Sequence, residues 1–192
     1  MDQRGHPKNP LHREQLHLEQ LATRFLEASA EEEPHLAKSL GSLNADGMRE
    51  LGGILGRLDV RGKGELDATE RLLARRVLVR LHKPSVEMLV LTNKVLDYLD
   101  LDANALIDEE ELELCVRIIE LFTHADGDND TLSHRELEML YAVLRHLDTN
   151  GNGQLDPNER LALHAGLAKP AEFLAAQKFS NPHLRALLAN AR

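Results

Sequence analysis

Oxygen-bearing side chains recur at regular intervals over a twelve-residue stretch, residues 148–159. They stand at positions 1, 3, 5, 9 and 12 of the stretch and are Asp148, Asn150, Asn152, Asp156 and Glu159. Gln154, at position 7, offers its backbone carbonyl. A calcium ion takes about six to eight oxygen ligands at about 2.3–2.6 Å. Gly153, at position 6, permits the sharp bend because glycine adopts a positive φ angle at little steric cost. The pattern predicts a loop that wraps a hard divalent cation in oxygen.

The same spacing occurs upstream at residues 100–111, where the ligand positions hold Asp100, Asp102, Asn104, Asp108 and Glu111. Leu106 supplies the carbonyl at position 7, and Ala105 stands where a glycine is expected. A Cβ at positive φ costs roughly 1–2 kcal/mol. This stretch has one acidic ligand more than residues 148–159, and the added charge is expected to offset part of that strain.

A third copy, residues 59–70, keeps Asp59, Asp67 and Glu70 in the ligand frame but carries Arg61 and Lys63 at positions 3 and 5. Two cations repel a third from the same pocket. We therefore expect this loop to have lost metal binding. Arg61 or Lys63 is expected to neutralise Glu70 or Asp67 and so keep the loop closed without an ion.

A fourth acidic stretch, residues 126–136, is one residue short. Asp126, Asp128, Asp130 and Glu136 match ligand positions 1, 3, 5 and 12. Ser133 and Glu136 also form a Ser-x-x-Glu capping box for a following helix. The sequence leaves open whether this stretch binds metal or only caps a helix.

Leucine and other apolar residues bracket all of these stretches at helical spacing. With its flanks, the pattern resembles the EF-hand calcium-binding superfamily over about residues 46–165. We name the stretches in chain order the first (59–70), second (100–111), third (126–136) and fourth (148–159) loops. The resemblance implies helix–loop–helix units, calcium at the second and fourth loops, a third ion at the third loop if that loop binds one, and competition by magnesium.

Composition favours an all-α protein, because leucine and alanine dominate a chain of 192 residues with only 3% aromatic residues. We expect an EF-hand array with extra N- and C-terminal helices, divided into a segment 1–43, a domain 44–168 and a segment 169–192. The net charge of -9 disfavours nucleic acid as a partner. No apolar run is long enough for membrane insertion and no signal core is present, so we expect a cytoplasmic protein.

Periodicity and capping residues predict a helix in each apolar segment. The expected ranges are 11–29, a short stretch before Gly41, 46–58, 68–82, 86–99, 109–123, 134–147, 157–168 and two short helices within 171–190.

The intervals between loops predict their arrangement. The loops begin at residues 59, 100, 126 and 148, so the last two intervals each hold a single helix. The first, second and fourth loops should therefore gather at one end, with the third at the other. We expect the second and fourth loops to pair through a short antiparallel β-bridge between Ile107 and Leu155. The first loop then pairs with the second, is covered by a terminal segment, or meets its copy in a homodimer.

The expected function is that of a calcium sensor or modulator with a dedicated protein partner, and the alternatives are a calcium buffer and purely structural calcium. Only four methionines are present, which disfavours a broad adaptable groove. The segments 11–29 and 171–190 either occupy the apolar groove as internal ligands or serve as core helices. We expect no enzyme; a remote alternative is a hydrolase that uses Cys115, which requires an exposed thiol.

Overall fold

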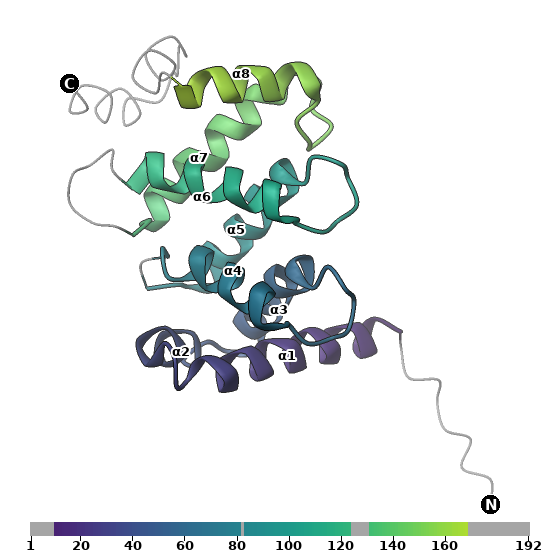
Figure 1. Cartoon of the computed structure of the whole chain (residues 1–192), viewed down its shortest axis with the longest axis vertical. Helices are drawn as coiled ribbons and strands as arrows, with labels where there is room; N and C mark the ends of the chain where they lie inside the picture. The colour runs from purple at the N-terminus through teal and green to yellow at the C-terminus, as the bar shows by residue number, and fades with distance from the viewer. Residues whose placement is uncertain (1–9, 82, 124–130, 169–192) are drawn as a thin grey trace, which may run out of the picture.

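Three helix–loop–helix units are stacked along the long axis of the molecule in the computed structural model (Figure 1). The structure describes residues 10–81, 83–123 and 131–168. The units are formed by α3 (Ala45–Leu58) with α4 (Ala68–Leu78), α5 (Val86–Leu99) with α6 (Glu109–Thr123), and α7 (His134–Leu147) with α8 (Pro157–Ala168). Helices α1 (Pro10–Ser29) and α2 (Pro34–Leu40) cover the end of the stack beside α3.

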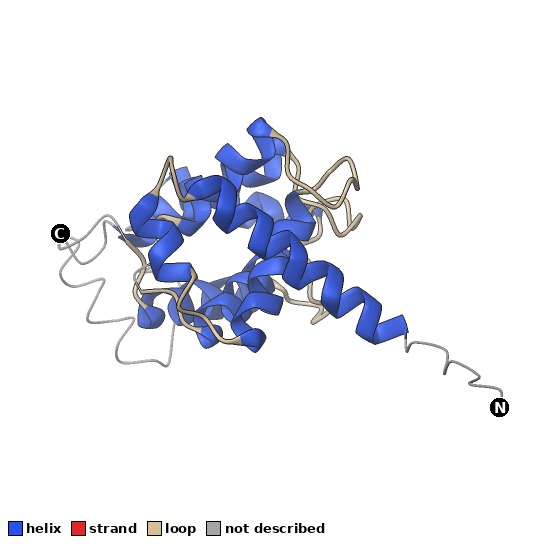
Figure 2. Ribbon diagram, turned by 90° about the horizontal axis from the view of Figure 1, so that it is seen from below, coloured by secondary structure: helices blue, strands red, loops and turns tan. Residues whose placement is uncertain are grey.

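The described residues form helices and loops without a β-strand, as Figure 2 shows, so the all-α prediction is confirmed. Most helices begin and end within a residue or two of the predicted positions. Helix α4 ends at Leu78 rather than at residue 82. The chain leaves the helix there because Leu81 forms an isolated parallel bridge with Leu132, whose N–H donates to the Arg80 carbonyl at 2.5 Å. None of the described helices has the length and apolar character needed to span a membrane.

Side-chain caps set several helix starts, which explains why the sequence located them. Asn44 accepts a hydrogen bond from the Gly47 N–H at the start of α3, and Ser85 accepts one from Met88 at the start of α5. These bonds satisfy backbone donors that the first turn of a helix leaves without partners.

The leading helices of the units form one layer. Helix α5 packs extensively against α3 on one side and α7 on the other, and α1 packs on the far side of α3. The contact between α1 and α3 is close because Gly52 has no side chain: a Cβ there would lie 2.2 Å from the Leu18 carbonyl oxygen. Buried apolar residues form one continuous core from Leu21 and Phe25 in α1 to Leu163 in α8.

Polar and aromatic contacts also join neighbouring units. Arg57 of α3 pairs with Asp97 of α5, and Arg80 pairs with Glu120 of α6. The rings of Tyr98 in α5 and Tyr141 in α7 lie 6.0 Å apart. Each of these contacts connects one unit to the next one in the stack.

The first, second and fourth loops lie along one edge of the stack (Figure 1). These three loops lie together as the loop spacing predicted, and the third loop lies largely outside the described residues. The predicted bridge between Ile107 and Leu155 is wrong. The Ile107 N–H donates instead to the Arg57 carbonyl at 2.7 Å. The units are stacked one above another, so the loops do not face each other as an antiparallel pair requires.

The structure also bears on the terminal segments. Helix α1 buries Leu21, Ala22 and Phe25, so segment 11–29 is a core helix, as one of the two alternatives held. Segment 171–190 lies outside the described residues. The division of the chain at residues 43 and 168 stays a prediction.

Candidate metal-binding loops

The first, second and fourth loops share one backbone conformation, with positive φ angles at positions 4 and 6. These residues are Gly62 and Gly64 (62° and 72°), Ala103 and Ala105 (61° and 64°), and Gly151 and Gly153 (70° and 83°). The strain expected at Ala105 is present, and Ala103 adds a second alanine in the same strained region.

The aspartate at position 1 organises each of these loops. In the first, second and fourth loops the backbone N–H groups at positions 5 and 6 donate to its carboxylate oxygens over 2.7–3.1 Å. Asp59 and Asp100 are buried, with 6% and 5% of their surface exposed. The loop backbone is therefore curled around a carboxylate that lies inside it.

The glutamate at position 12 closes each loop from the other side. The N–H at position 9 donates to its Oε2 atom, and its own N–H donates back to the position 9 side chain. Ser133 and Glu136 do the same in the third loop, so the capping box predicted there is confirmed. The first, second and fourth loops show the same reciprocal bonds, so the capping box is compatible with both alternatives for the third loop. Asp126, Asp128 and Asp130 lie outside the described residues.

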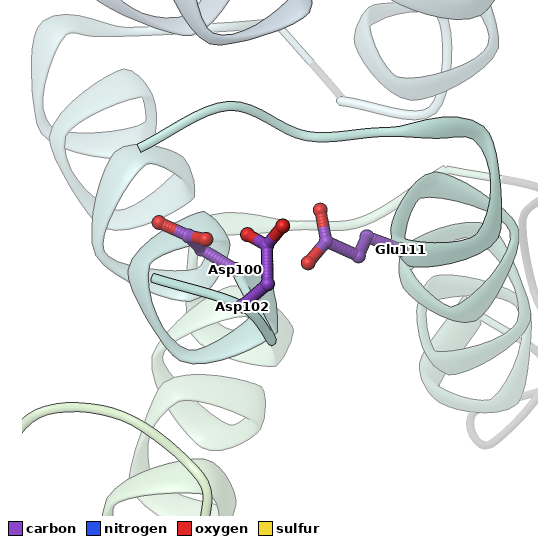
Figure 3. A group of neighbouring side chains, drawn as sticks. All are labelled: Asp100, Asp102 and Glu111. Carbon is purple, nitrogen blue, oxygen red and sulfur yellow. The ribbon is translucent and has the colours of Figure 1, made fainter. Parts of the chain in front are cut away.

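The second loop brings three carboxylates together (Figure 3). Asp100 and Asp102, at the end of α5, and Glu111, in the first turn of α6, offer oxygens that all lie within 4.8 Å of one another. Two oxygens bound to one calcium ion at about 2.3–2.6 Å are at most about 5.2 Å apart. The donor set consists of hard oxygens and its spread is within the span across one such ion, so these three residues could hold a metal ion.

Electrostatics at the second loop favour an added cation. Glu111 is only 3% exposed, and burial raises its pKa; the carboxylates of Asp108 and Asp102 raise it further, against hydrogen bonds from the backbone of Asp108 and Leu101. Holding this group ionised beside other carboxylates is unfavourable. A bound cation would remove that repulsion.

The remaining predicted ligands of the second loop lie around this cluster with their oxygens engaged in local bonds. The Asn104 Oδ1 atom accepts from the Leu106 N–H at 2.7 Å, and the Asn104 amide donates to Asp102 at 2.7 Å. Asp108 accepts from the Glu111 N–H at 2.9 Å. Occupation by an ion through Asn104 and Asp108 would compete with these local hydrogen bonds.

The fourth loop has the same frame with less charge. Asn150, Asn152 and Asp156 each accept from the backbone N–H group two residues on. Among the described residues, the carboxylates of this loop do not converge as those of the second loop do. The pKa of Glu159 is lowered, chiefly by the hydrogen bond from the Asp156 backbone and then by Thr149. Its charge is thus stabilised by donors, whereas Glu111 has carboxylate neighbours.

The first loop is held closed by the chain itself. Arg61 pairs with Asp67 at 3.1 Å, which confirms the expected neutralisation of that carboxylate. The pKa of Asp67 is lowered, first by the Glu70 N–H and also by the Thr69 N–H and the charges of Arg61 and Lys63. Arg24 of α1 donates to the Gly64 carbonyl at 3.2 Å, so a terminal helix covers this loop.

Cys115 does not meet the requirement of the hydrolase alternative. Its side chain lies in the core at 1% exposure, and burial raises the pKa of the thiol to about 12. The thiolate that a nucleophilic mechanism needs is strongly disfavoured there.

Sequence reasoning missed two arginines that follow the last glutamate of a loop. Arg71 and Arg160 both donate to the carbonyl at position 8 of their own loop, Leu66 at 2.8 Å and Leu155 at 2.6 Å. The recurrence of Glu-Arg at the end of the first and fourth loops was the available signal.

In comparisons with known proteins, no family model, curated protein or solved structure matches the chain.

Proposed function

We propose that this protein binds calcium through the second and fourth loops, as an EF-hand-type protein whose units are stacked in a linear array. The observation that carries the proposal is the group of Asp100, Asp102 and Glu111, whose oxygens converge within 4.8 Å on a loop with the ligand spacing. The fourth loop repeats the backbone conformation and the glutamate closure of the second.

The ion supplies positive charge where the chain has concentrated negative charge. At the second loop it offsets the repulsion between the buried Glu111 and the exposed carboxylates of Asp102 and Asp108, and at both loops it orders the path from one helix of a unit to the next. Calcium suits the site better than a transition metal because all the ligand atoms are oxygens. Magnesium competes for the same oxygens at lower coordination number.

The role that follows is a calcium-dependent modulator of a protein partner. Exposed apolar side chains stand in or close to the loops in the sequence: Val60, in the first loop, is 49% exposed, and Leu72 and Leu161, two residues after Glu70 and Glu159, are 56% and 68% exposed. Ordering of the loops by calcium changes how these side chains are presented to a partner. Buffering and purely structural calcium remain the competing roles.

Calcium titration by calorimetry on chelator-treated protein tests the binding proposal. We expect a stoichiometry of two, falling to one in Glu111→Gln and in Glu159→Gln and to zero in the double variant. Glu110→Gln is the matched control, because Glu110 neighbours Glu111, is exposed, and lies outside the cluster. Absence of uptake at millimolar calcium by the parent protein would refute the proposal.

Two further measurements separate the remaining alternatives. A third equivalent of calcium that disappears in Glu136→Gln would assign a site to the third loop. A calcium-dependent rise in binding of an apolar dye favours the modulator over a buffer, since a buffer barely opens on binding.

A further inference from the structure

A single arginine connects the second and fourth loops. Arg160 directly follows Glu159, the last predicted ligand of the fourth loop. Its Nε atom donates to the Leu155 carbonyl at 2.6 Å within the same loop. Its terminal nitrogen donates to the carbonyl of Leu101, in the second loop of the neighbouring unit.

Leu101 occupies a sensitive position in the second loop. It stands between two predicted ligands, Asp100 and Asp102. Its N–H donates to the Oε1 atom of Glu111 at 2.5 Å, and its carbonyl accepts from Arg160. The backbone of Leu101 is therefore hydrogen-bonded both to Glu111, a predicted ligand of its own loop, and to Arg160, which follows the last predicted ligand of the fourth loop.

Arg71 provides a comparison within the same chain. It holds the same place after Glu70, and its terminal Nη1 atom donates to the carbonyl at the same position of its own loop, that of Leu66, at 2.8 Å. Among the described residues, this side-chain hydrogen bond stays within its own unit. The second loop is bonded to the first unit through the Ile107 N–H and the Arg57 carbonyl, in addition to the ion pairs between these units described above. The bridge made by Arg160 is thus specific to the two loops proposed to bind calcium.

We propose that Arg160 couples the two calcium sites, so that an ion in the fourth loop raises the affinity of the second loop and the reverse. This inference rests on the proposed function. An ion bound through Glu159 fixes the start of α8 and with it the Arg160 guanidinium. The guanidinium then holds the Leu101–Asp102 peptide in the orientation that places Asp102 beside Glu111, so less ordering remains for the second ion to bring about.

The coupling has the same size in both directions, because linkage between two binding equilibria is reciprocal. Couplings between protein sites are commonly about 5- to 150-fold in affinity. The contact here is a bridge of hydrogen bonds without large apolar burial, so we expect a value near the lower end, about 5- to 10-fold.

The experiment compares single-site and two-site affinities. Glu111→Gln leaves only the fourth site and Glu159→Gln leaves only the second, and each gives an intrinsic dissociation constant. In the parent protein, the product of the two dissociation constants should be about 5- to 10-fold smaller than the product of the two intrinsic dissociation constants. Arg160→Met keeps the apolar stem of the side chain but removes its donors. With Arg160→Met, the ratio of these two products should become one. Each intrinsic dissociation constant should stay within about twofold of its value with Arg160 present, which is well below the expected coupling.

Arg71→Met is the matched control, because it removes the equivalent arginine from the loop proposed to lack metal, and it should leave the coupling intact. A readout without calcium tests the contact itself. The ¹⁵N resonance of the Asp102 amide, which shares a peptide group with the Leu101 carbonyl, should shift in Arg160→Met and stay in place in Arg71→Met. Arg160→Lys retains charge with one donor group and should restore only part of the coupling.

Each outcome distinguishes the two proposals. No calcium uptake by the parent protein would refute the proposed function. Two independent sites in the parent, or an unchanged ratio in Arg160→Met, would overturn the coupling while leaving calcium binding in place. A uniform loss of both intrinsic affinities in Arg160→Met with the ratio retained would assign Arg160 a structural role and would also overturn the inference.

Discussion

Replacing the two strained alanines of the second loop by glycine should stabilise the calcium-free protein. Ala103 and Ala105 have φ angles of 61° and 64°. An L-residue with a Cβ loses roughly 1–2 kcal/mol in this region relative to a favoured conformation. Glycine relieves that strain but gives the unfolded chain more freedom, which costs about 0.4–1 kcal/mol. The net gain expected is about 0.5–1 kcal/mol for each substitution, since the first term exceeds the second.

Both alanines are exposed, so the substitutions remove little packing. Ala142→Gly is the matched control: Ala142 is also exposed but lies within helix α7. It should lose about 1 kcal/mol, because glycine disfavours a helix. The same chemical change is therefore expected to have opposite signs at the two kinds of position.

The reverse substitutions test the same reasoning in the fourth loop. Gly151→Ala and Gly153→Ala introduce a Cβ at positive φ where it meets nothing within 4 Å, so the cost arises from the backbone alone. Each should lower the free energy of unfolding by about 0.5–1 kcal/mol. Gly64→Ala should cost more, because its Cβ would lie 2.6 Å from the His17 ring.

Urea denaturation followed by circular dichroism, in the presence of chelator, gives these changes. Hydrogen exchange of the loop amides supplies a local measure. If Ala103→Gly and Ala105→Gly destabilise the protein as much as Ala142→Gly does, then the second loop does not hold the left-handed conformation and the argument from strain fails.

Three other predictions follow from contacts described above. Arg61→Asp combined with Lys63→Asn restores oxygen ligands to the first loop and should raise the calcium stoichiometry by one; calorimetry with an unchanged stoichiometry would argue that the covering α1 helix blocks this loop. Ser133→Ala removes the cap of α7 and should lower the free energy of unfolding by about 1 kcal/mol, measured by urea denaturation, and an effect near zero would contradict a stabilising cap. Burial raises the pKa of Cys115 to about 12, so its thiol stays protonated in the native state at a pH of about 8.5, where an exposed cysteine is half ionised. Alkylation by iodoacetamide at that pH should therefore be no faster than unfolding. Rapid labelling of the folded protein would contradict the buried placement.

Local chemistry made the helices and loops predictable. Ser133 is a helix cap in the sequence pattern and in the structure, because a cap depends on residues only a few positions away. The ligand spacing placed Asp100, Asp102 and Glu111 in one loop, and the structure brings their oxygens together. The strain at Ala103 was equally readable, since Gly62 and Gly151 hold the same position in the neighbouring loops.

Contacts between units were not predictable in the same way. The expected partner of Ile107 was Leu155, but its N–H bonds to the Arg57 carbonyl. That outcome depends on how whole units are placed against each other, through the packing of α3, α5 and α7. The bridge from Arg160 to Leu101 has the same origin, since the two residues are separated by 59 positions.

The stacked architecture has a consequence for how the protein loses its structure. Extensive contacts join each unit to the next, and the described helices of the first and third units share no extensive contact. The stability of such an assembly is approximately the sum of the intrinsic stabilities of its units and the interaction free energies between neighbouring units. Melting is then expected to begin at a free end and to travel inward one element at a time, with α5 as the last helix to lose its neighbours. Partly folded forms that retain α1 to α6 should accumulate before the whole chain unravels, and the temperature at which they appear should rise with calcium.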